Sequence, residues 1–334
     1  MQRLRAGIIG LGVGEQHIAG YRSAGVDVVA LCDMNSEKLM EVGRKYPECR
    51  IVKSAEAILD AQDIEVVSIA SYDHHHATQV MRAISNGKHV FSEKPLCTTE
   101  EELGAIFNLL SSHPDVRLST NTILRMSKRF RDIHQRVRCG DLGKIYYLEA
   151  DYNYGRLEKI LGGWRGEVPD YSVMLGGGIH MVDLLIWMVG SPVLEVSAIG
   201  NKVCSEGASF STPDMVIAWL RFADGTIGKV GANFGCVYPH FHKVGIYGTK
   251  GTFENGITGG VMIQKNNALI TQSSVMSAYP GLEKGDLIPS FISGVRGEKI
   301  VEIDEAQVFE TMAVCLAIER SLGSGQNEVV KHYF

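Results

Sequence analysis

A glycine-rich turn follows the first apolar run of the chain. It connects that run to a segment with helical spacing and reads Gly10, Leu11, Gly12, Val13 and Gly14. Glycines at a strand-to-helix turn let the backbone bend sharply and approach a pyrophosphate, whose charge the helix N-terminus stabilises. The third glycine comes one position earlier than in the GxGxxG pattern, so the turn alone also fits a corner without a ligand.

An acidic residue, Asp33, ends the second apolar run. A carboxylate at this place accepts hydrogen bonds from an adenosine ribose, so together with the glycine turn it predicts dinucleotide binding. It would repel a 2′-phosphate, and the residues from Met34 to Ser36 bring no cation; Lys38 is the nearest. The sequence therefore favours NAD over NADP. Asp33 could also be the N-cap of the next helix.

Lys94 stands between Glu93 and Pro95 at the end of a short apolar run. A residue before proline is held out of the helical region, so this lysine is presented stiffly where a cofactor would lie. The alternative is an ordinary surface lysine at a turn.

Three consecutive histidines, His74, His75 and His76, follow another buried run. Neighbouring positions point in different directions, and no Asp/Cys/His set at ligand spacing accompanies them, so we expect no metal site. Their place at the carboxyl end of a predicted strand favours cofactor contact or helix capping.

Another histidine, His180, lies three residues before Asp183 on a predicted helix, so both side chains can face one cleft. Without further context, a histidine in an apolar helix is more often a core residue. Aromatic and arginine side chains nearby in sequence suit stacking on sugar rings and pairing with anions, and equally suit a core at a domain junction. They are Tyr154, Trp164 and Arg165, and Arg125 has a similar standing.

The elements that would position these residues differ along the chain. From residue 5 to about 120, short β-rich runs alternate with amphipathic helical segments, which indicates βαβ units and a parallel sheet covered on both faces. We predict a doubly wound dinucleotide-binding domain over residues 1–122.

The pattern changes after about residue 125. The runs 145–154 and 194–203 are typical of strands, and Asp224-Gly225 between alternating apolar runs predicts a hairpin. Residues 123–334 are predicted to form an α+β domain with a mostly antiparallel sheet. A last amphipathic helix, ended by Gly323 and able to pack at the domain junction, closes the chain.

Composition limits the partners. The chain has 334 residues, 33 Lys and Arg against 38 Asp and Glu (net charge −5), and 45% apolar residues, which suits about two globular domains. The charge balance argues against nucleic acid and anionic membrane surfaces, and no apolar stretch is long enough to span a membrane. Seven dispersed cysteines without CxxC spacing predict neither disulfides nor zinc and fit a reducing cytoplasm.

Together these motifs make the sequence similar to a known family. The resemblance covers nearly the whole chain and is carried by Asp33 and the stretches GIIGLGVGEQH, SIASYDHHHA, GKHVFSEKPL and LGGGIHMVDLLIWMVG. The chain resembles the Gfo/Idh/MocA oxidoreductases, which include glucose-fructose oxidoreductase and inositol 2-dehydrogenase. The resemblance implies a Rossmann domain, a nicotinamide cofactor in a cleft, and a second domain whose large open sheet makes homodimer or homotetramer contacts.

The resemblance also implies roles for individual residues. Lys94 and His180 would be the proton-transfer groups when NAD oxidises a secondary alcohol of a sugar, cyclitol or nucleotide-linked sugar. The glycine turn would hold the phosphates and Asp33 the ribose. Further cofactor contacts would come from Ser71, His76, Glu93 and Asn121.

One position departs from the family pattern. Many members carry an aspartate four residues before the histidine, where this chain has Gly176. Either another residue, such as Asp170 or Asp183, takes over the role of that aspartate, or the role is absent. Two other functions stay open: a glycosidase that oxidises its sugar transiently with NAD, and a non-catalytic ligand sensor on the same fold. The presence of both Lys94 and His180 weighs against the sensor.

Overall fold

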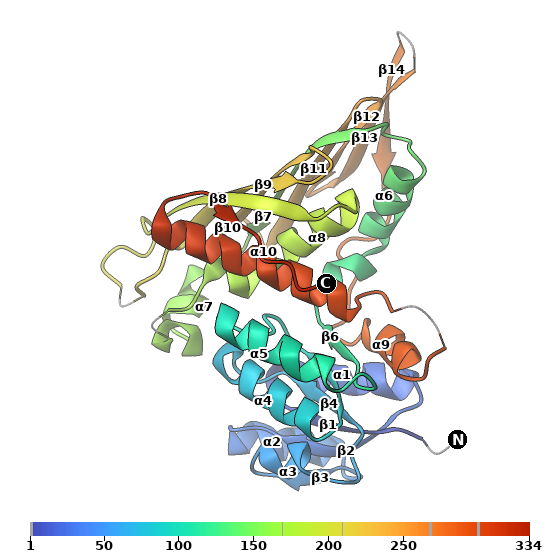
Figure 1. Ribbon diagram of the computed structural model, residues 1–334, viewed down its shortest axis with the longest axis vertical. Coiled ribbons are helices and arrows are strands. Elements are labelled where there is room, and N and C mark those ends of the chain that lie inside the picture. Colours follow the sequence, from blue (N-terminus) through green and yellow to red (C-terminus); the bar gives the residue numbers. More distant parts are fainter. Residues whose placement is uncertain (1–2, 169, 209, 267–268, 299–300) are drawn as a thin grey trace. The chain divides into compact units, whose positions relative to one another are not determined.

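The chain divides by its internal contacts into two compact units. The first comprises Met1–Met126, Leu282–Met312 and Tyr333–Phe334, and the second comprises Ser127–Gly281 and Ala313–His332 (Figure 1). The computed structural model describes residues 3–168, 170–208, 210–266, 269–298 and 301–334.

Six parallel strands form the sheet of the first unit, in the order β3-β2-β1-β4-β5-β6. They are β1 (Arg5–Ile9), β2 (Asp27–Cys32), β3 (Arg50–Val52), β4 (Val66–Ile69), β5 (His89–Ser92) and β6 (Leu118–Thr120). β1 pairs with both β2 and β4, so the strand order reverses beside β1. Open parallel sheets bind ligands at such a switch point, beyond the carboxyl ends of the strands.

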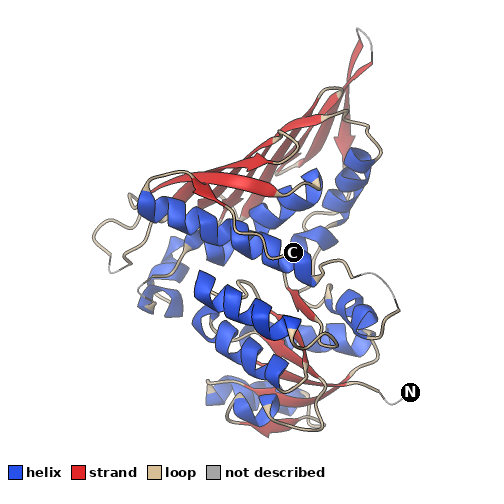
Figure 2. Ribbon diagram, viewed as in Figure 1, coloured by secondary structure: helices blue, strands red, loops and turns tan. Residues whose placement is uncertain are grey.

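Helices cover both faces of this sheet (Figure 2). α1 contacts α2 and α9, whereas α4 contacts α3 and α5. Their bounds are α1 (Leu11–Ser23), α2 (Ser36–Lys45), α3 (Glu56–Leu59), α4 (Asp73–Ser85), α5 (Glu100–Ser111) and α9 (Ile288–Val295), and a 3₁₀ turn, η1, spans Ile123–Met126. Thr99 forms a capping box with Glu102 at the start of α5, which satisfies N–H groups that the helix cannot bond.

Nine strands form the sheet of the second unit, in the order β14-β13-β12-β11-β7-β10-β9-β8-β15. They are β7 (Ile145–Asn153), β8 (Val193–Asn201), β9 (Met215–Phe222), β10 (Ile227–Asn233), β11 (Phe241–Gly248), β12 (Gly251–Gly256), β13 (Gly259–Asn266), β14 (Leu269–Val275) and β15 (Glu328–Val329). Neighbours pair antiparallel, except that β7 and β10 are parallel. Gly225, with φ of +88°, makes the predicted turn between β9 and β10.

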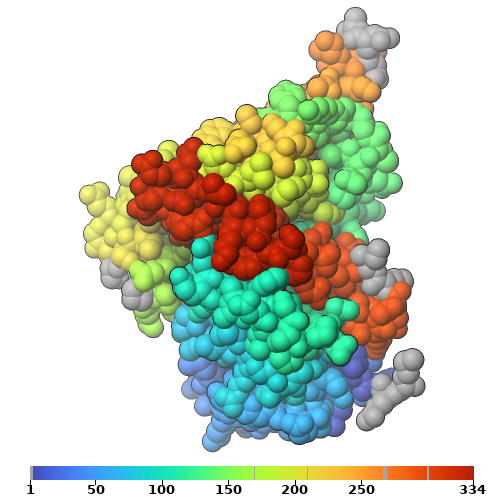
Figure 3. All heavy atoms as spheres, in the orientation of Figure 1, coloured from blue at the N-terminus to red at the C-terminus, as the bar shows by residue number. Residues whose placement is uncertain are grey.

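Helices pack on one face of this second sheet. α8 (Ile179–Val189) and the preceding π-helical turn η3 (Met174–Gly178) both contact β7 and β10, and α6 (Lys128–Arg138) packs on α8. Two short elements, α7 (Leu157–Leu161) and the 3₁₀ turn η2 (Trp164–Glu167), follow β7. The covered face buries Leu148 and Val230, whereas Trp219 and Ile227 on the opposite face are half exposed. β14 pairs with β13, and Figure 3 shows the orange atoms of this strand pair projecting beyond the green and yellow atoms of the same unit.

The predicted fold class is confirmed, since a parallel doubly wound sheet precedes a mostly antiparallel one. The contact boundary falls after Met126 rather than after residue 122, and Leu282–Met312 returns to the first unit. α10 (Glu305–Ser324) is divided between the units after Met312. No described helix is both long and apolar enough to cross a membrane.

The prediction that Gly323 ends the last helix is wrong. α10 continues to Ser324, and Gly325, with φ of +67°, is the residue that leaves it. Helices commonly end where a residue takes the left-handed conformation, and two nearby glycines can each supply it, so the sequence did not decide between them.

Candidate functional site

Each glycine of the turn between β1 and α1 is required for a different reason. Gly10 has φ of +85°, and a Cβ there would lie 2.2 Å from the Ala70 carbonyl oxygen. A Cβ on Gly14 would lie 2.8 Å from the Ile8 side chain, so this glycine brings α1 close to β1. A Cβ on Gly12 would meet nothing within 4 Å. The backbone at Gly12 therefore faces open space, as close approach of a pyrophosphate requires.

Asp33 braces the glycine turn. Its carboxylate accepts the Leu11 N–H at 2.6 Å and the Asn35 N–H at 2.7 Å. Asn35, not Asp33, is the N-cap of α2, because the Asn35 side chain accepts from the N–H groups of Glu37 and Lys38. A carboxylate has lone pairs for more than two bonds, so Asp33 can still accept from a ribose.

The nearest cation to Asp33 in sequence is engaged elsewhere. Lys38 lies 2.9 Å from Glu15, which also pairs with Lys45. Hydrogen bonds from Lys38 and Lys45 lower the pKa of Glu15. Lys38 therefore already has a carboxylate partner, which fits a site without a 2′-phosphate.

Ser71 and His76 lie beyond the carboxyl end of β4. His76 is fully buried; its Nδ1 is 2.6 Å from the Pro95 carbonyl oxygen and its Nε2 is 3.0 Å from the Ser71 carbonyl oxygen. Ser71 Oγ donates to Gln79 at 2.8 Å. His76 thus ties the turn after β4 to the turn that carries Lys94. Among the described residues, no group of His, Cys, Asp or Glu is arranged to hold a metal ion.

Glu93 is a buried carboxylate at the end of β5. Its Oε1 accepts from Asn121 Nδ2 at 2.6 Å and lies 3.3 Å from His17 Nε2. Burial raises the pKa of Glu93, but the contact with His17 and the positive charges of Lys284 and Lys94 outweigh burial and hold the pKa well below its ordinary value. The group is therefore a fixed negative charge beside Lys94.

Asn121 follows β6 and is fully buried. Its Nδ2 donates to Glu93 and to the Lys284 carbonyl oxygen, which fixes the orientation of the amide. Its Oδ1 has no hydrogen-bond partner among the described atoms. A buried acceptor without a donor is costly, so a ligand N–H or O–H fits here. This orphan oxygen and the open backbone at Gly12 both suit a nicotinamide dinucleotide.

Arg125 is buried in the first unit and donates to the Glu302 carbonyl oxygen at 3.2 Å. This bond holds η1 to Leu282–Met312, the later segment of the chain that belongs to the first unit. The bond gives Arg125 a structural role. The predicted contact of Arg125 with a substrate stays a prediction.

The second unit carries His180 and Asp183. Both lie on α8, directly after the π-helical turn, and are 6% and 1% exposed. The His180 ring stacks with Tyr152 of β7 at a centroid distance of 6.1 Å. π-helical turns occur often at functional sites, because they displace the residues that follow.

Aromatic rings surround this part of the second unit. Tyr154 stacks with Tyr152 at 5.9 Å. The Arg165 guanidinium lies 4.6 Å from the Trp164 ring centroid, and its Nε donates to the Tyr171 hydroxyl at 3.1 Å. The predicted substrate residues directly after β7 and in η2 therefore belong to networks of stacked rings within this unit.

Tyr171 occupies the place of a side chain at Gly176. A Cβ on Gly176 would lie 1.9 Å from the Tyr171 hydroxyl oxygen, so the hydroxyl fills the space that a residue four positions before His180 would use. The sequence suggested Asp170 and Asp183 for this part and missed Tyr171. Other residues it missed are His17 and Lys284; a histidine on the buried face of α1 was the one available signal.

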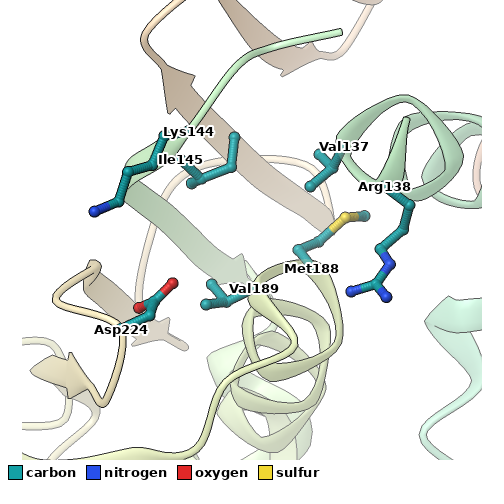
Figure 4. Close-up of a pocket in the computed structure, with 7 residues that line it drawn as sticks. All are labelled: Val137, Arg138, Lys144, Ile145, Met188, Val189 and Asp224. Atoms are coloured by element: carbon teal, nitrogen blue, oxygen red, sulfur yellow. The ribbon is translucent and has the colours of Figure 1, made fainter. Parts of the chain in front are cut away.

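A pocket of about 200 Å³ opens elsewhere in the second unit (Figure 4). It is lined by Val137, Arg138, Lys144, Ile145, Met188, Val189 and Asp224. None of the predicted site residues lines it, so we do not assign it to the candidate site.

The first unit thus has the features of a dinucleotide-binding Rossmann domain: an open glycine turn, an acidic residue after β2 and a buried polar cluster after β5 and β6. A family profile described as "Oxidoreductase family, NAD-binding Rossmann fold" matches residues 4–122. A second, described as "GFO/IDH/MocA C-terminal domain", matches residues 130–254. The chain belongs to the Gfo/Idh/MocA family of NAD-binding oxidoreductases, as its motifs predicted.

Relatives in this family act on different compounds. Myo-inositol 2-dehydrogenase of Thermotoga maritima is 25% identical over 74% of this chain and 74% of its own length. The 1,5-anhydro-D-fructose reductase of Ensifer adhaerens is 25% identical over 88% of this chain and 80% of its own. The WlbA dehydrogenase of Bordetella pertussis, solved with NADH and UDP-GlcNAcA, has the same fold, with a TM-score of 0.83 and 22% identity over 99% of both chains.

Proposed function

We propose that this protein is an NAD-dependent dehydrogenase that transfers a hydride between nicotinamide and a secondary alcohol of a sugar, cyclitol or nucleotide-linked sugar. The observation that carries the proposal is the cluster after β5 and β6. There Lys94 directly follows the buried Glu93, whose carboxylate accepts from the Asn121 amide, and the oxygen of that amide has no partner among the described atoms. The glycine turn follows β1 of the same sheet.

Lys94 and His180 are the proposed proton-transfer groups. Bound NAD would take up the hydride from the carbinol carbon. The imidazole of His180 would accept the hydroxyl proton, since a histidine titrates near neutral pH. The Lys94 ammonium would stabilise the negative charge that develops on the alcohol oxygen.

The proposed cofactor contacts lie in the first unit. The N–H groups in the first turn of α1 would bind the pyrophosphate, and Asp33 would bind the adenosine ribose. Asn121 Oδ1 would accept a hydrogen bond from a donor on the nicotinamide half of the cofactor. Ser71, His76 and Glu93 would shape the turns that surround the cofactor, through their hydrogen bonds to Gln79, Pro95 and Asn121.

The proposed substrate contacts lie in the second unit. Tyr154 and Trp164 offer ring faces for a sugar, and Arg165 offers a guanidinium for a carboxylate or phosphate. Asp183 would orient His180 or accept from a substrate hydroxyl. The relatives' named compounds support the range of cyclitols, sugars and nucleotide-linked sugars.

The central test is Lys94→Ala. Turnover should fall by about 10²- to 10⁴-fold, the usual contribution of a general acid or base, while NAD affinity stays close to that of the unchanged protein. NADH absorbance measures turnover, and fluorescence titration measures affinity. Lys250→Ala, at an exposed turn of the second unit, is the matched control. Near-normal turnover in Lys94→Ala would refute the assignment.

One substrate screen separates the three functions. Sugars, polyols and nucleotide sugars are each incubated with NAD, and both NADH release and glycoside cleavage are followed. Net NADH supports the dehydrogenase. Cleavage without net NADH supports the transient oxidation of a glycosidase, and saturable binding without either supports a sensor.

A second copy of this chain is the proposed partner of the open sheet face. Ile199, Trp219 and Ile227 lie on that face of β8, β9 and β10 and are 72%, 51% and 50% exposed. Apolar side chains grouped on one face of a soluble domain commonly mark a protein interface. We therefore propose a homodimer or homotetramer formed through this sheet.

A cytoplasmic location is also a proposal. All seven cysteines have free thiols, and those of Cys32, Cys49, Cys97 and Cys315 are buried. Thiols persist in a reducing compartment. Cell fractionation followed by immunoblotting tests the location.

A further inference from the structure

A line of buried polar side chains links α1 to the ends of β4, β5 and β6 in the first unit. His17, in the second turn of α1, is fully buried; its Nδ1 lies 2.8 Å from Ser68 Oγ and its Nε2 lies 3.3 Å from Glu93 Oε1. The same Glu93 oxygen accepts from Asn121 Nδ2 at 2.6 Å. The line therefore ends at Asn121 and, along the backbone, one residue from Lys94.

The His17 ring is fixed on three sides. The Ser68 hydroxyl meets Nδ1, and the Phe91 ring packs edge-on at a centroid distance of 5.5 Å. A carboxylate has no proton to donate, so an attractive contact requires a proton on Nε2. Packing and the serine hold this nitrogen 3.3 Å from Glu93 Oε1, in an electrostatic contact that lacks the geometry of a full hydrogen bond.

The Glu93 carboxylate owes its direction to its side-chain partners. The Glu93 backbone is held by strand bonds, since its N–H donates to the Ile69 carbonyl oxygen at 2.7 Å. The carboxylate itself can rotate, and its two described side-chain partners are His17 and Asn121. When a buried charge loses one of two partners, its side chain moves to find a new partner, or the folded state carries the free-energy cost of a partly unpaired charge.

We infer that His17 is a positioning residue, which holds the Glu93 carboxylate so that Asn121 and Lys94 are correctly oriented. This inference rests on the proposed function, in which Lys94 acts on the substrate. With the carboxylate held, both Asn121 N–H bonds go to protein acceptors, and Oδ1 is left to face a ligand. If the Glu93 carboxylate is displaced, the Asn121 amide can rotate, and the negative charge next to Lys94 changes position.

Two substitutions of His17 separate its hydrogen bond to Ser68 from its contact with Glu93. The amide of His17→Gln reaches the position of Nε2 and keeps a donor for Glu93, whereas that of His17→Asn reaches only the position of Nδ1 and keeps the bond to Ser68. We expect His17→Asn to weaken NADH binding by about tenfold, the effect of one misplaced hydrogen bond. We expect its kcat to fall by about 10- to 100-fold, as a small misplacement near the reacting atoms does. His17→Gln should restore most of both.

Three measurements are made on each variant of the full chain. They are the NADH dissociation constant by fluorescence, kcat and KM on a substrate from the screen, and the melting temperature. His89→Asn is the control, because His89 is half buried at the opposite end of β5 and its Nδ1 accepts the Arg117 N–H, a bond that asparagine can keep. If His17→Asn and His17→Gln lose stability equally and neither changes NADH affinity or kcat, His17 only packs and the inference is wrong.

Glu93→Gln examines the same link if His17→Asn does not fold. It keeps the volume of Glu93 and removes its charge, so it should weaken NADH binding. Adding His17→Ala, which removes both ring nitrogens, should then cause a smaller loss than His17→Ala causes alone. Additive losses, or an unchanged NADH affinity in Glu93→Gln, would overturn the inference. Lys94→Ala separates this outcome from a failure of the proposed function: an active Lys94→Ala refutes the function itself. An inactive Lys94→Ala beside a fully normal His17→Asn refutes only the role of His17.

Discussion

At the scale of the residue, Asp33 combines two tasks in one carboxylate. It fixes the glycine turn through the Leu11 N–H and the residue before α2 through the Asn35 N–H. Both bonds orient the carboxylate at the switch point of the sheet, where an adenosine ribose would lie. Its charge is therefore expected to exclude a 2′-phosphate while its position supports the turn.

The preference for NAD over NADP tests whether the charge of Asp33 excludes a 2′-phosphate. We expect NAD to bind at least about tenfold more tightly than NADP, because like charges at a binding site are costly. In Asp33→Asn the ratio of the two dissociation constants should fall by about tenfold, and taking the ratio cancels any shared effect on the turn. Fluorescence titration measures both, and Glu37→Gln, at an exposed position of α2, controls for the lost charge. Tighter binding of NADP to the unchanged protein would contradict the prediction.

At the scale of the element, α10 shows how a helix end is decided. Gly323 and Gly325 differ by two positions, yet only Gly325 takes a positive φ. A Cβ on either residue would meet nothing within 4 Å, so neither is required for close packing. Their effects on stability should therefore come from backbone conformation alone.

Alanine at these two glycines should change stability in opposite directions. Gly323→Ala should stabilise by about 0.5–1 kcal/mol, because glycine in a helix loses more conformational freedom on folding than alanine. Gly325→Ala should destabilise by about 1–2 kcal/mol, the cost of a left-handed conformation for a residue with a Cβ. Urea denaturation followed by circular dichroism measures both, and each variant is the other's control. A shift of the same sign in both would contradict the explanation.

At the scale of the whole molecule, the second sheet has one covered face and one open face. α8 and η3 bury residues of β7 and β10 on the covered face. The open face combines exposed apolar residues with ion pairs, including Lys229 with Asp151 and Arg221 with Glu195. Such a mixture of an apolar centre and charged groups is typical of an interface between protein copies.

A charge placed on the open face should separate the copies. We expect the unchanged protein to elute at a multiple of 36.6 kDa, and Trp219→Glu to shift it toward a smaller species, because a buried unpaired charge opposes association. Light scattering coupled to size-exclusion chromatography measures the mass. Val237→Glu, on the exposed loop between β10 and β11, is the control. An unchanged mass for Trp219→Glu, or a monomeric unchanged protein, would exclude this interface.

The sequence by itself determined the fold class, the glycine turn, the strand-end positions of Asp33 and Lys94, and the helix that carries His180. Each rests on a local pattern, because the periods of helices and strands and the conformational needs of glycine and proline act within a few residues. Family membership followed from the same motifs.

Only the tertiary structure decided which residues support these positions. It brought His17, Glu93 and Asn121 together from three elements, returned Leu282–Met312 to the first unit, and placed the Tyr171 hydroxyl in the space above Gly176. Residues 28 and more positions apart share hydrogen bonds here, as Glu93 and Asn121 do. Such bonds depend on how the elements pack, and packing across the chain leaves no periodic signal in the sequence.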